Sequence, residues 1–336
     1  MAKKVLIVGP KFFNYNQSIQ SCFIKLGFEA MVRGYETLTS NVTKKVINKL
    51  FYISNCTKFT EYEIKKFNYG LIQDYLKFKP DIVLVIKGEI LFASTLQAMS
   101  DCLRICWMQD SIFRFQQCMN NVQNYDKLFL FEKTDVDKLE SIGIKSEFLP
   151  MAFDDTIYFP VNHNKDIDIL FIGTLKGDRI KLLKTLIKCL PNLNIQIYGK
   201  YLPVLDFYKT YKYFTQKEYM HFKNINVCPV DSNILYSRTK IALNIHISQS
   251  SFGCNPRVYE ILGSRTFQLV DYNPFIAKEF GGMLSTYKSP DEMIQNIRYY
   301  IKNDKEREQI ASLGYNKVSQ SDRFIDRVST LLYLSL

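Results

Sequence analysis

The sequence predicts an α/β protein made of two doubly wound domains, each built on a parallel β-sheet with crossover helices. Short apolar runs alternate with helical patterns along the whole chain, which is typical of parallel sheets. The apolar runs form two successive sets. The length of 336 residues also exceeds the roughly 250–300 residues at which single cores stop growing. We therefore expect two domains with their sheets facing a central cleft.

The first set of apolar runs predicts the sheet of an N-terminal domain. Helical patterns lie between these runs, for instance over 18–26 and 61–77. The expected strands are 5–9, 30–33, 82–86, 105–108, 128–131 and 147–149.

The second set predicts another sheet, and a helix capped by Ser289 follows it. The boundary lies between Pro150 and Pro160, where neither periodicity persists. We expect domains over 1–152 and 153–321, with an amphipathic helix over 322–336 that packs back on the first domain. The expected strands of the second domain are 169–173, 195–198, 225–228, 241–245, 266–270 and 283–286.

Composition indicates a cytoplasmic globular protein. No apolar run reaches the roughly eighteen residues of a membrane-spanning helix, and the eight scattered cysteines form no Cys-x-x-Cys pair, which favours buried free thiols. The net charge of +11 fits either a solvated basic surface or a diphosphate site with peripheral contact to an anionic membrane. The lysines are dispersed and interleaved with acids, which argues against nucleic acid as a partner.

Two glycine turns follow predicted strands of the second domain. Gly173 and Thr174 lead into a helix that begins near Arg179, and Gly199 with Lys200 follows the next strand. Glycine lets a backbone approach a phosphate, and a helix amino terminus favours anions. A phosphate contact and a purely structural turn explain this pattern about equally well.

A third motif begins at Asn255-Pro256 and places Arg257 and Glu260 on the first turn of a helix. An arginine there can bridge phosphate oxygens, and a glutamate can accept hydrogen bonds from ribose hydroxyls. The alternative is an exposed intrahelical ion pair, which would contribute only a few tenths of a kcal/mol.

Other polar residues lie at strand ends. His246 ends an apolar strand and is a ligand-contact candidate, with a satisfied core histidine as the alternative. The three histidines are too dispersed for a metal cluster, and Asp168 enters a strand rather than ending one, so we expect no metal site. In the first domain, Glu89 and Asp110 follow strands, and either could deprotonate a hydroxyl. An N-cap explains Asp110 equally well.

With these motifs in place, the chain resembles the GT-B glycosyltransferases of the spore maturation protein type, which grade into family-1-like glycosyltransferases. The resemblance covers most of the chain and is clearest over 168–327. The matching segments are 168–174, 198–199, 236–245, 255–260, 269–271 and 287–292, with looser matches over 107–110, 125–128 and 149–152.

The resemblance implies a GT-B fold of two Rossmann-like domains and transfer of a sugar from a nucleotide-diphosphate sugar to a hydroxyl of a glycan, lipid-linked or protein acceptor. The donor would bind the second domain and the acceptor the first. Glu260 matches the second glutamate of the family's E-x7-E motif, which binds ribose, but Phe252 stands at the first position. The late histidine-containing pattern of the family is also missing, because 321–327 contains no histidine.

For such a reaction, Arg257 with Arg179 or Lys240 would neutralise the leaving group, so no metal cofactor is expected. A UDP-sugar is the favoured co-substrate, with GDP- and dTDP-sugars as alternatives. Asp110 or Glu89 would be the base if the reaction inverts configuration. A nucleotide-sugar epimerase of the same fold and a non-catalytic polyanion-binding protein are the rival hypotheses.

Overall fold

The computed structural model describes residues 2–11, 14–35, 58–202, 207–246 and 251–336. Contacts among the residues divide the chain into two units. Unit 1 consists of Met1–Met151 with Phe324–Leu336, and unit 2 of Ala152–Arg323. Among the described residues each unit contains one parallel sheet, which confirms the predicted α/β class.

The sheet of unit 1 has six parallel strands in the order β2-β1-β3-β4-β5-β6. Its central strands are buried on both faces, since every residue from Val5 to Val8 and from Val83 to Val85 is 0% exposed. Continuous apolar runs of this kind are typical of parallel sheets covered by helices. The strands are β1 (Lys4–Pro10), β2 (Glu29–Tyr35), β3 (Ile82–Ile86), β4 (Leu103–Met108), β5 (Lys127–Leu130) and β6 (Glu147–Phe148).

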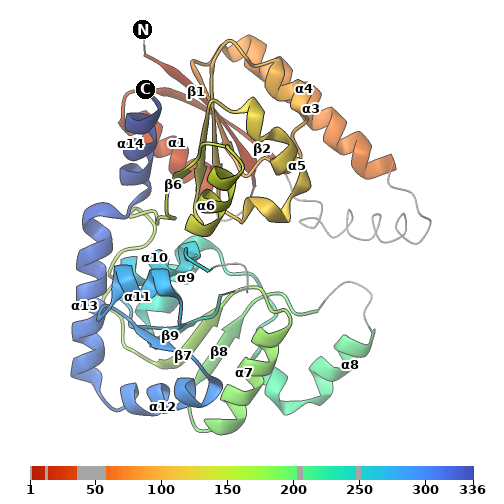
Figure 1. Cartoon of the computed structure of the whole chain (residues 1–336). Helices are drawn as coiled ribbons and strands as arrows, with labels where there is room; N and C mark the ends of the chain where they lie inside the picture. The colour runs from red at the N-terminus through yellow and green to blue at the C-terminus, as the bar shows by residue number, and fades with distance from the viewer. Residues whose placement is uncertain (1, 12–13, 36–57, 203–206, 247–250) are drawn as a thin grey trace. The chain divides into compact units, whose positions relative to one another are not determined.

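The C-terminal helix α14 (Phe324–Ser335) is part of unit 1, although it follows unit 2 in the sequence. Figure 1 shows it in blue beside α1 (Tyr15–Lys25) in red, and the two helices are in contact. Phe324 is 2% exposed, and its ring centroid lies 6.2 Å from that of Trp107 and 5.6 Å from that of Tyr15. The other helices in the described part of unit 1 are α3 (Lys58–Phe78), α4 (Ala93–Gln97), α5 (Gln116–Asn121) and α6 (Lys133–Ser141), with 3₁₀ turns η1 (Ile112–Arg114) and η2 (Val122–Asn124).

The sheet of unit 2 has five parallel strands in the order β11-β10-β9-β7-β8. Its apolar side chains alternate between faces. Ile169 and Phe171 of β7 join one core cluster with residues of the neighbouring strands, while Leu170 is buried on the opposite face. The strands are β7 (Ile167–Ile172), β8 (Ile195–Tyr198), β9 (Thr239–Asn244), β10 (Gln268–Asp271) and β11 (Ser285–Tyr287).

The helices of unit 2 surround this sheet (Figure 1). Helix α7 (Asp178–Cys189) contacts α12 (Pro290–Tyr300), and α10 (Pro256–Gly263) contacts both α9 (Pro229–Ser237) and α13 (Asp304–Ser321). The remaining elements are α8 (Phe207–Thr215), α11 (Pro274–Phe280) and the 3₁₀ turn η3 (Lys217–His221).

One predicted strand of unit 2 is wrong. The segment 225–228 is irregular rather than a strand, and Ile225 is 51% exposed. Pro229 follows directly at the first helical position of α9, where the sulfur of Cys228 accepts a hydrogen bond from the Asp231 backbone N–H. The apolar run therefore marks a helix start. The expected cap at Ser289 is confirmed, because its side chain accepts a hydrogen bond from the Glu292 N–H.

Two composition-based expectations concern membranes and thiols. None of the described helices combines the length and apolar character that crossing a bilayer needs. Five described cysteines are buried, whereas Cys189 and Cys228 are exposed. Cys56 lies outside the described residues.

We predict that Phe324→Ala destabilises unit 1 by about 3–5 kcal/mol, because it leaves a cavity beside Trp107 and Tyr15. Trp107 is the only tryptophan of the chain and is fully buried, so its fluorescence during denaturant unfolding reports on unit 1. Tyr333→Ala on the same helix is the control, since Tyr333 is 86% exposed. Equal unfolding midpoints for the two variants would contradict this role of α14.

Candidate functional site

The strand order of unit 2 identifies one edge of the sheet where a ligand site is expected. Strand β7 lies between β8 and β9, so the connections leaving β7 and β9 run to opposite sides. In open α/β sheets, ligands bind outside the carboxyl ends of strands at such a switch point. We call this region the β7–β9 edge. It contains Gly173 and Thr174 after β7, Ile245 and His246 after β9, and Asn255 at the start of α10.

Two arginines connect the loops at the β7–β9 edge. Arg257, from the first turn of α10, donates a hydrogen bond to the carbonyl of Ile172 at the end of β7. Arg179, from the first turn of α7, donates to the carbonyl of Ile245 after β9 and, at 3.2 Å, to that of Thr174. Helix α10 therefore holds the end of β7, and helix α7 holds the segment that follows β9.

The electrostatics of these arginines favour an anion. Burial, and then the positive charge of Arg257, lower the pKa of the Arg179 guanidinium, whereas Asp271 opposes this effect. No carboxylate in the described part of the chain lies within ion-pair distance of Arg179, and its Nε atom is buried without a hydrogen-bond acceptor there. The neighbouring positive charge makes the partly buried guanidinium of Arg179 costly, and a bound anion would reduce that cost.

His246 supports the start of α10. Its backbone N–H and its Nδ1 contact Oδ1 of Asp271 at 2.7 and 3.0 Å, and its Nε2 accepts from the Asn255 backbone N–H at 3.2 Å. Because Nε2 accepts, the ring proton lies on Nδ1 and is donated to Asp271. The Asn255 side chain also exchanges two amide hydrogen bonds of 3.1 Å with Asn244. Both ring nitrogens of His246 are thus occupied within the protein, as the core-histidine alternative expects.

Glu260 lies on α10 and is only 2% exposed. Burial and then the negative charge of Glu260 raise the pKa of Tyr158. Burial also raises the pKa of Tyr236, on which the charges of Arg257 and Glu260 act in opposite directions. Glu260 and Arg257 therefore share one buried polar environment. Phe252, at the position of the family's first glutamate, instead packs its ring 5.8 Å from that of Phe275.

Lys240 is not at this edge, contrary to the sequence-based prediction. It lies near the amino end of β9, where its Nζ atom is 2.8 Å from Oδ1 of Asp168 on β7. The two residues sit near the starts of paired parallel strands, so they face away from the carboxyl edge. Asp166 is likewise paired with Arg238. No group of three or more His, Cys, Asp or Glu side chains among the described residues is arranged to hold a metal ion.

Gly199 lets the backbone after β8 lie directly against the backbone after β7. Its φ is 155°, and an added Cβ would lie 2.0 Å from the carbonyl oxygen of Gly173, so a side chain there would collide with backbone. The Gly173 N–H donates to the Tyr198 carbonyl at 2.9 Å. The two glycines thus hold the ends of β7 and β8 together, while the adjacent Lys200 side chain is exposed.

A second polar cluster lies at the carboxyl edge of the unit 1 sheet. The Nζ atom of Lys87 is 3.4 Å from a carboxylate oxygen of Glu89 and 3.1 Å from one of Asp110. Tyr35, at the end of β2, donates its hydroxyl hydrogen bond to Glu89, and Arg114 is 2.9 Å from Asp110. The structure therefore brings both predicted base candidates to one ammonium group.

The backbone that follows β3 has an unusual conformation at this cluster. Lys87 has φ of 69°, in the left-handed region that non-glycine residues rarely adopt, and Gly88 has φ of 79°. The Lys87 Nζ atom also lies 4.4 Å from the ring centroid of Phe115. Burial and the Glu89 charge raise the pKa of Tyr35, and they raise that of Cys118 to about 12, so both groups remain neutral hydrogen-bonding partners near neutral pH.

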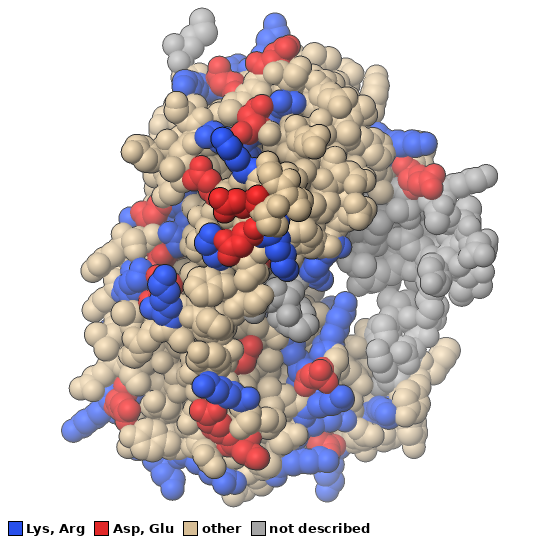
Figure 2. All heavy atoms as spheres, in the orientation of Figure 1, with Lys and Arg blue, Asp and Glu red and all other residues tan. Residues whose placement is uncertain are grey.

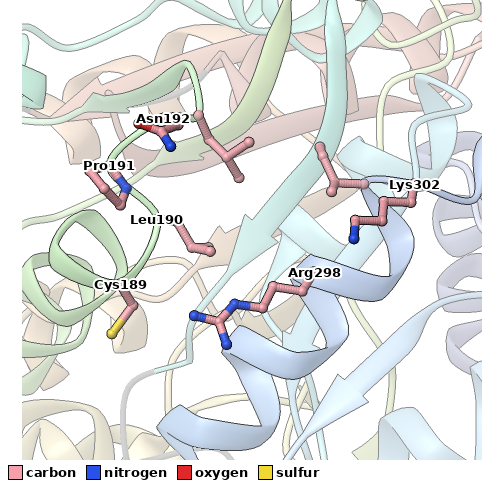
Figure 3. A pocket seen from close by; sticks show the side chains of 8 residues that line it. Cys189, Leu190, Pro191, Asn192, Arg298 and Lys302 are labelled. Carbon is pink, nitrogen blue, oxygen red and sulfur yellow. The ribbon is translucent and has the colours of Figure 1, made fainter.

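A hollow of about 190 Å³ in unit 2 lies away from the β7–β9 edge (Figure 3). It is lined by the end of α7, by the connection from Leu190 to Leu193 that precedes β8, and by Arg298 and Lys302 of the α12 region. This connection leads into the amino end of β8. The hollow therefore lies at the amino ends of the strands, whereas the β7–β9 edge lies at their carboxyl ends.

Three residues of these clusters were not predicted individually from sequence. Asp271 ends β10 and Tyr35 ends β2, while Lys87 directly follows β3. A polar residue at the carboxyl end of an apolar strand is the shared signal, and it also identified Glu89, Asp110 and His246. What sequence could not supply is the strand order, which decides which strand ends become neighbours.

Comparison with known families adds to this geometry. Residues 179–333 match the model of the family described as glycosyl transferase-like. The resemblance to GT-B glycosyltransferases is confirmed. The matched segment begins at Arg179 and includes α10 with Arg257 and Glu260. No curated protein matches the chain by sequence.

Solved GT-B structures are similar over nearly the whole chain. Sucrose-phosphate synthase of Thermosynechococcus elongatus has a TM-score of 0.70 at 8% identity, covering 99% of this chain and 98% of its own. HepE of Anabaena, in complex with UDP-glucose, has 0.65 at 10%, covering 98% and 99%. A Listeria monocytogenes protein described as a UDP-N-acetylglucosamine 2-epimerase has 0.61 at 10%, covering 99% and 95%. At such identities these likenesses establish the fold alone.

We predict that Lys87→Met destabilises unit 1 by about 2 kcal/mol, less than the ~3–5 kcal/mol of a fully buried pair, because the ion pairs remain partly exposed. The substitution removes the positive charge that both carboxylates contact, whereas Arg114 still pairs with Asp110. Denaturant unfolding followed by Trp107 fluorescence measures the loss of stability relative to the wild type.

Lys133→Met is the matched control, since its pair with Asp137 is exposed and lies between adjacent turns of α6. An equal loss of stability in Lys87→Met and Lys133→Met would show that the Lys87 ion pairs contribute no more than an exposed pair.

Proposed function

We propose that the protein is a glycosyltransferase that moves a sugar from a nucleotide-diphosphate sugar to a hydroxyl acceptor. The observation that carries the proposal is the pair of arginines at the β7–β9 edge, Arg179 and Arg257. The match to a glycosyl transferase-like family includes both arginines, and it supports sugar transfer over the epimerase alternative of the same fold.

A diphosphate suits this edge chemically. Its charge would offset the Arg179 guanidinium, and the buried Nε of Arg179 would gain an acceptor either directly or through a small movement of the side chain. The amino terminus of α10, held by Asn255 and His246, adds the positive end of a helix dipole. As the bond to the sugar breaks, negative charge develops on the leaving diphosphate, and these groups would stabilise it.

In this proposal Glu260 binds the ribose hydroxyls, as the family resemblance implies. Glu260 is 2% exposed, so ribose binding requires its carboxylate to become accessible. UDP is the favoured nucleotide, because HepE, which shares the fold, was solved with UDP-glucose. GDP and dTDP are the alternatives.

The proposed reaction needs no metal, since arginines take over the neutralisation of the diphosphate. Activity that persists in EDTA would agree with this. Restoration of an EDTA-inactivated enzyme by a divalent cation would contradict it.

The first nucleotide-binding prediction concerns the phosphates. Arg257→Met should weaken UDP binding by about tenfold to hundredfold, since hydrogen bonds to charged groups contribute about 1.5–3 kcal/mol. Its affinity for uridine, which has no phosphate, should change little. Calorimetric titration with UDP and uridine measures both. Arg298→Met removes an exposed arginine of α12 as the control.

The second nucleotide-binding prediction concerns the ribose. Glu260→Gln should weaken UDP and uridine by the same factor, because the lost hydrogen bond is common to both. Binding of UDP that is unchanged in both Arg257→Met and Glu260→Gln would refute the proposed donor site. A loss confined to the arginine variant would leave the phosphate site intact and remove only the ribose role.

The catalytic prediction concerns unit 1. If the reaction inverts configuration, Asp110→Asn should slow transfer by about 100-fold or more at unchanged UDP affinity, because a positioned general base contributes about 10²–10⁴-fold. Asp110 is the better candidate because it is more exposed than Glu89, at 24% against 15% of the side chain. UDP release from UDP-glucose with a panel of hydroxyl acceptors measures the rate.

Glu89→Gln is the companion variant, since it shares the same lysine partner. A normal rate in both variants would exclude a base role for this cluster and would favour a retaining reaction. The epimerase alternative predicts conversion of the UDP-sugar without any acceptor, which the same assay detects.

A further inference from the structure

The outer face of α8 in unit 2 carries an unusual group of exposed aromatic side chains. Phe207 is 82% exposed, Tyr211 68% and Phe214 76%. They are separated by four and three residues, which places them in one stripe along the helix. Tyr208, 67% exposed, lies beside the stripe. Clustered exposed aromatic residues on a single helix face indicate an interaction surface. We call these four residues the α8 aromatic face.

The helix is firmly held from its other side, so the exposure is not a consequence of a loosely attached segment. The ring of Tyr213 stacks on Tyr201 with centroids 6.2 Å apart, and its hydroxyl donates to the Phe222 carbonyl at 2.7 Å. The Tyr201 and Tyr219 hydroxyls are 2.8 Å apart. Tyr201, Tyr219 and Phe222 in turn belong to the core cluster of unit 2. The inward face is therefore packed, and the aromatic face is the side that points away from this core.

The chain segment of α8 carries a surplus of positive charge. Residues 207–223, from α8 to just past η3, contain four lysines and one acid. The Nζ atom of Lys212 lies 4.2 Å from the Tyr208 ring centroid, and that of Lys184 lies 4.0 Å from the Tyr219 ring centroid. Glu218 is paired with Lys188 at 3.4 Å. Figure 2 shows the uncharged surface of α8 at the right of unit 2, with blue side chains next to it.

We propose that the α8 aromatic face docks on the surface of an anionic lipid bilayer. Phenylalanine and tyrosine side chains enter the region between headgroups and acyl chains, and lysines beside them contact acidic headgroups. A protein partner could cover aromatic residues, but the lysines in and directly after α8, among them Lys212 and Lys217, complement a negatively charged surface. Docking through α8 would place unit 2 at a membrane without a membrane-spanning helix, and it does not depend on the proposed sugar transfer.

The test uses the full chain and vesicles of phosphatidylcholine, with or without phosphatidylglycerol, in a sedimentation assay. The wild type should bind the phosphatidylglycerol vesicles at low salt and dissociate as salt increases. Phe207→Ser combined with Phe214→Ser should weaken binding by at least about tenfold. Lys212→Ala combined with Lys217→Ala should also weaken vesicle binding relative to the wild type, by about fivefold for each lysine.

Ile142→Ser combined with Tyr333→Ser is the matched control, since these residues are 59% and 86% exposed on unit 1. Failure of the wild type to bind phosphatidylglycerol vesicles would overturn the proposal. Equal binding to pure phosphatidylcholine, or equal binding of the α8 and control variants, would also overturn it. If the wild type forms dimers that Phe207→Ser with Phe214→Ser dissociates, the face binds a second copy of the chain and the proposal is wrong. Calorimetric titration with UDP should give the same affinity for all variants, which separates this surface from the nucleotide site.

Discussion

The meeting of two arginines at the carboxyl edge of the second sheet is the interaction on which the candidate donor site depends. Arg257 reaches from α10 to the end of β7, and Arg179 reaches from α7 to the segment after β9. These hydrogen bonds to carbonyl oxygens determine where the loops of the edge lie. They also leave two positive groups close together with partial burial. The same contacts that order the edge therefore place the charges on which the proposed anion binding rests.

The rest of this edge can be understood as support for that pair. Asp271 orients His246, and His246 holds the Asn255 backbone, so the start of α10 is connected to the end of β10. Gly173 and Gly199 let the ends of β7 and β8 approach closely. The histidine, the asparagine and the two glycines thus fix the positions of the loops that carry the arginines and add no charge of their own. In unit 1 the arrangement is different, because one ammonium, that of Lys87, lies between the two carboxylates of Glu89 and Asp110.

Much of the fold was accessible from sequence for physical reasons. Parallel strands buried on both faces are continuous apolar runs, and such runs located the central strands β1, β3, β7 and β9 correctly. The same reasoning failed at 225–228, where an apolar run before a proline begins a helix. Periodicity could not separate these cases, since a four-residue run is too short to distinguish them.

The sequence by itself determined which residues stand at the ends of strands and starts of helices, because those positions depend on local patterns. It therefore indicated Arg179, His246, Arg257, Glu89 and Asp110. Only the tertiary structure decided which of them meet. Lys240 was expected beside Arg257, but it pairs with Asp168 near the amino end of its strand, because strand direction separates the two ends of β9. Lys87 became the shared partner of two carboxylates because β3 and β4 are neighbours in the sheet. Contacts of this kind depend on strand order and direction, which local residue patterns do not encode.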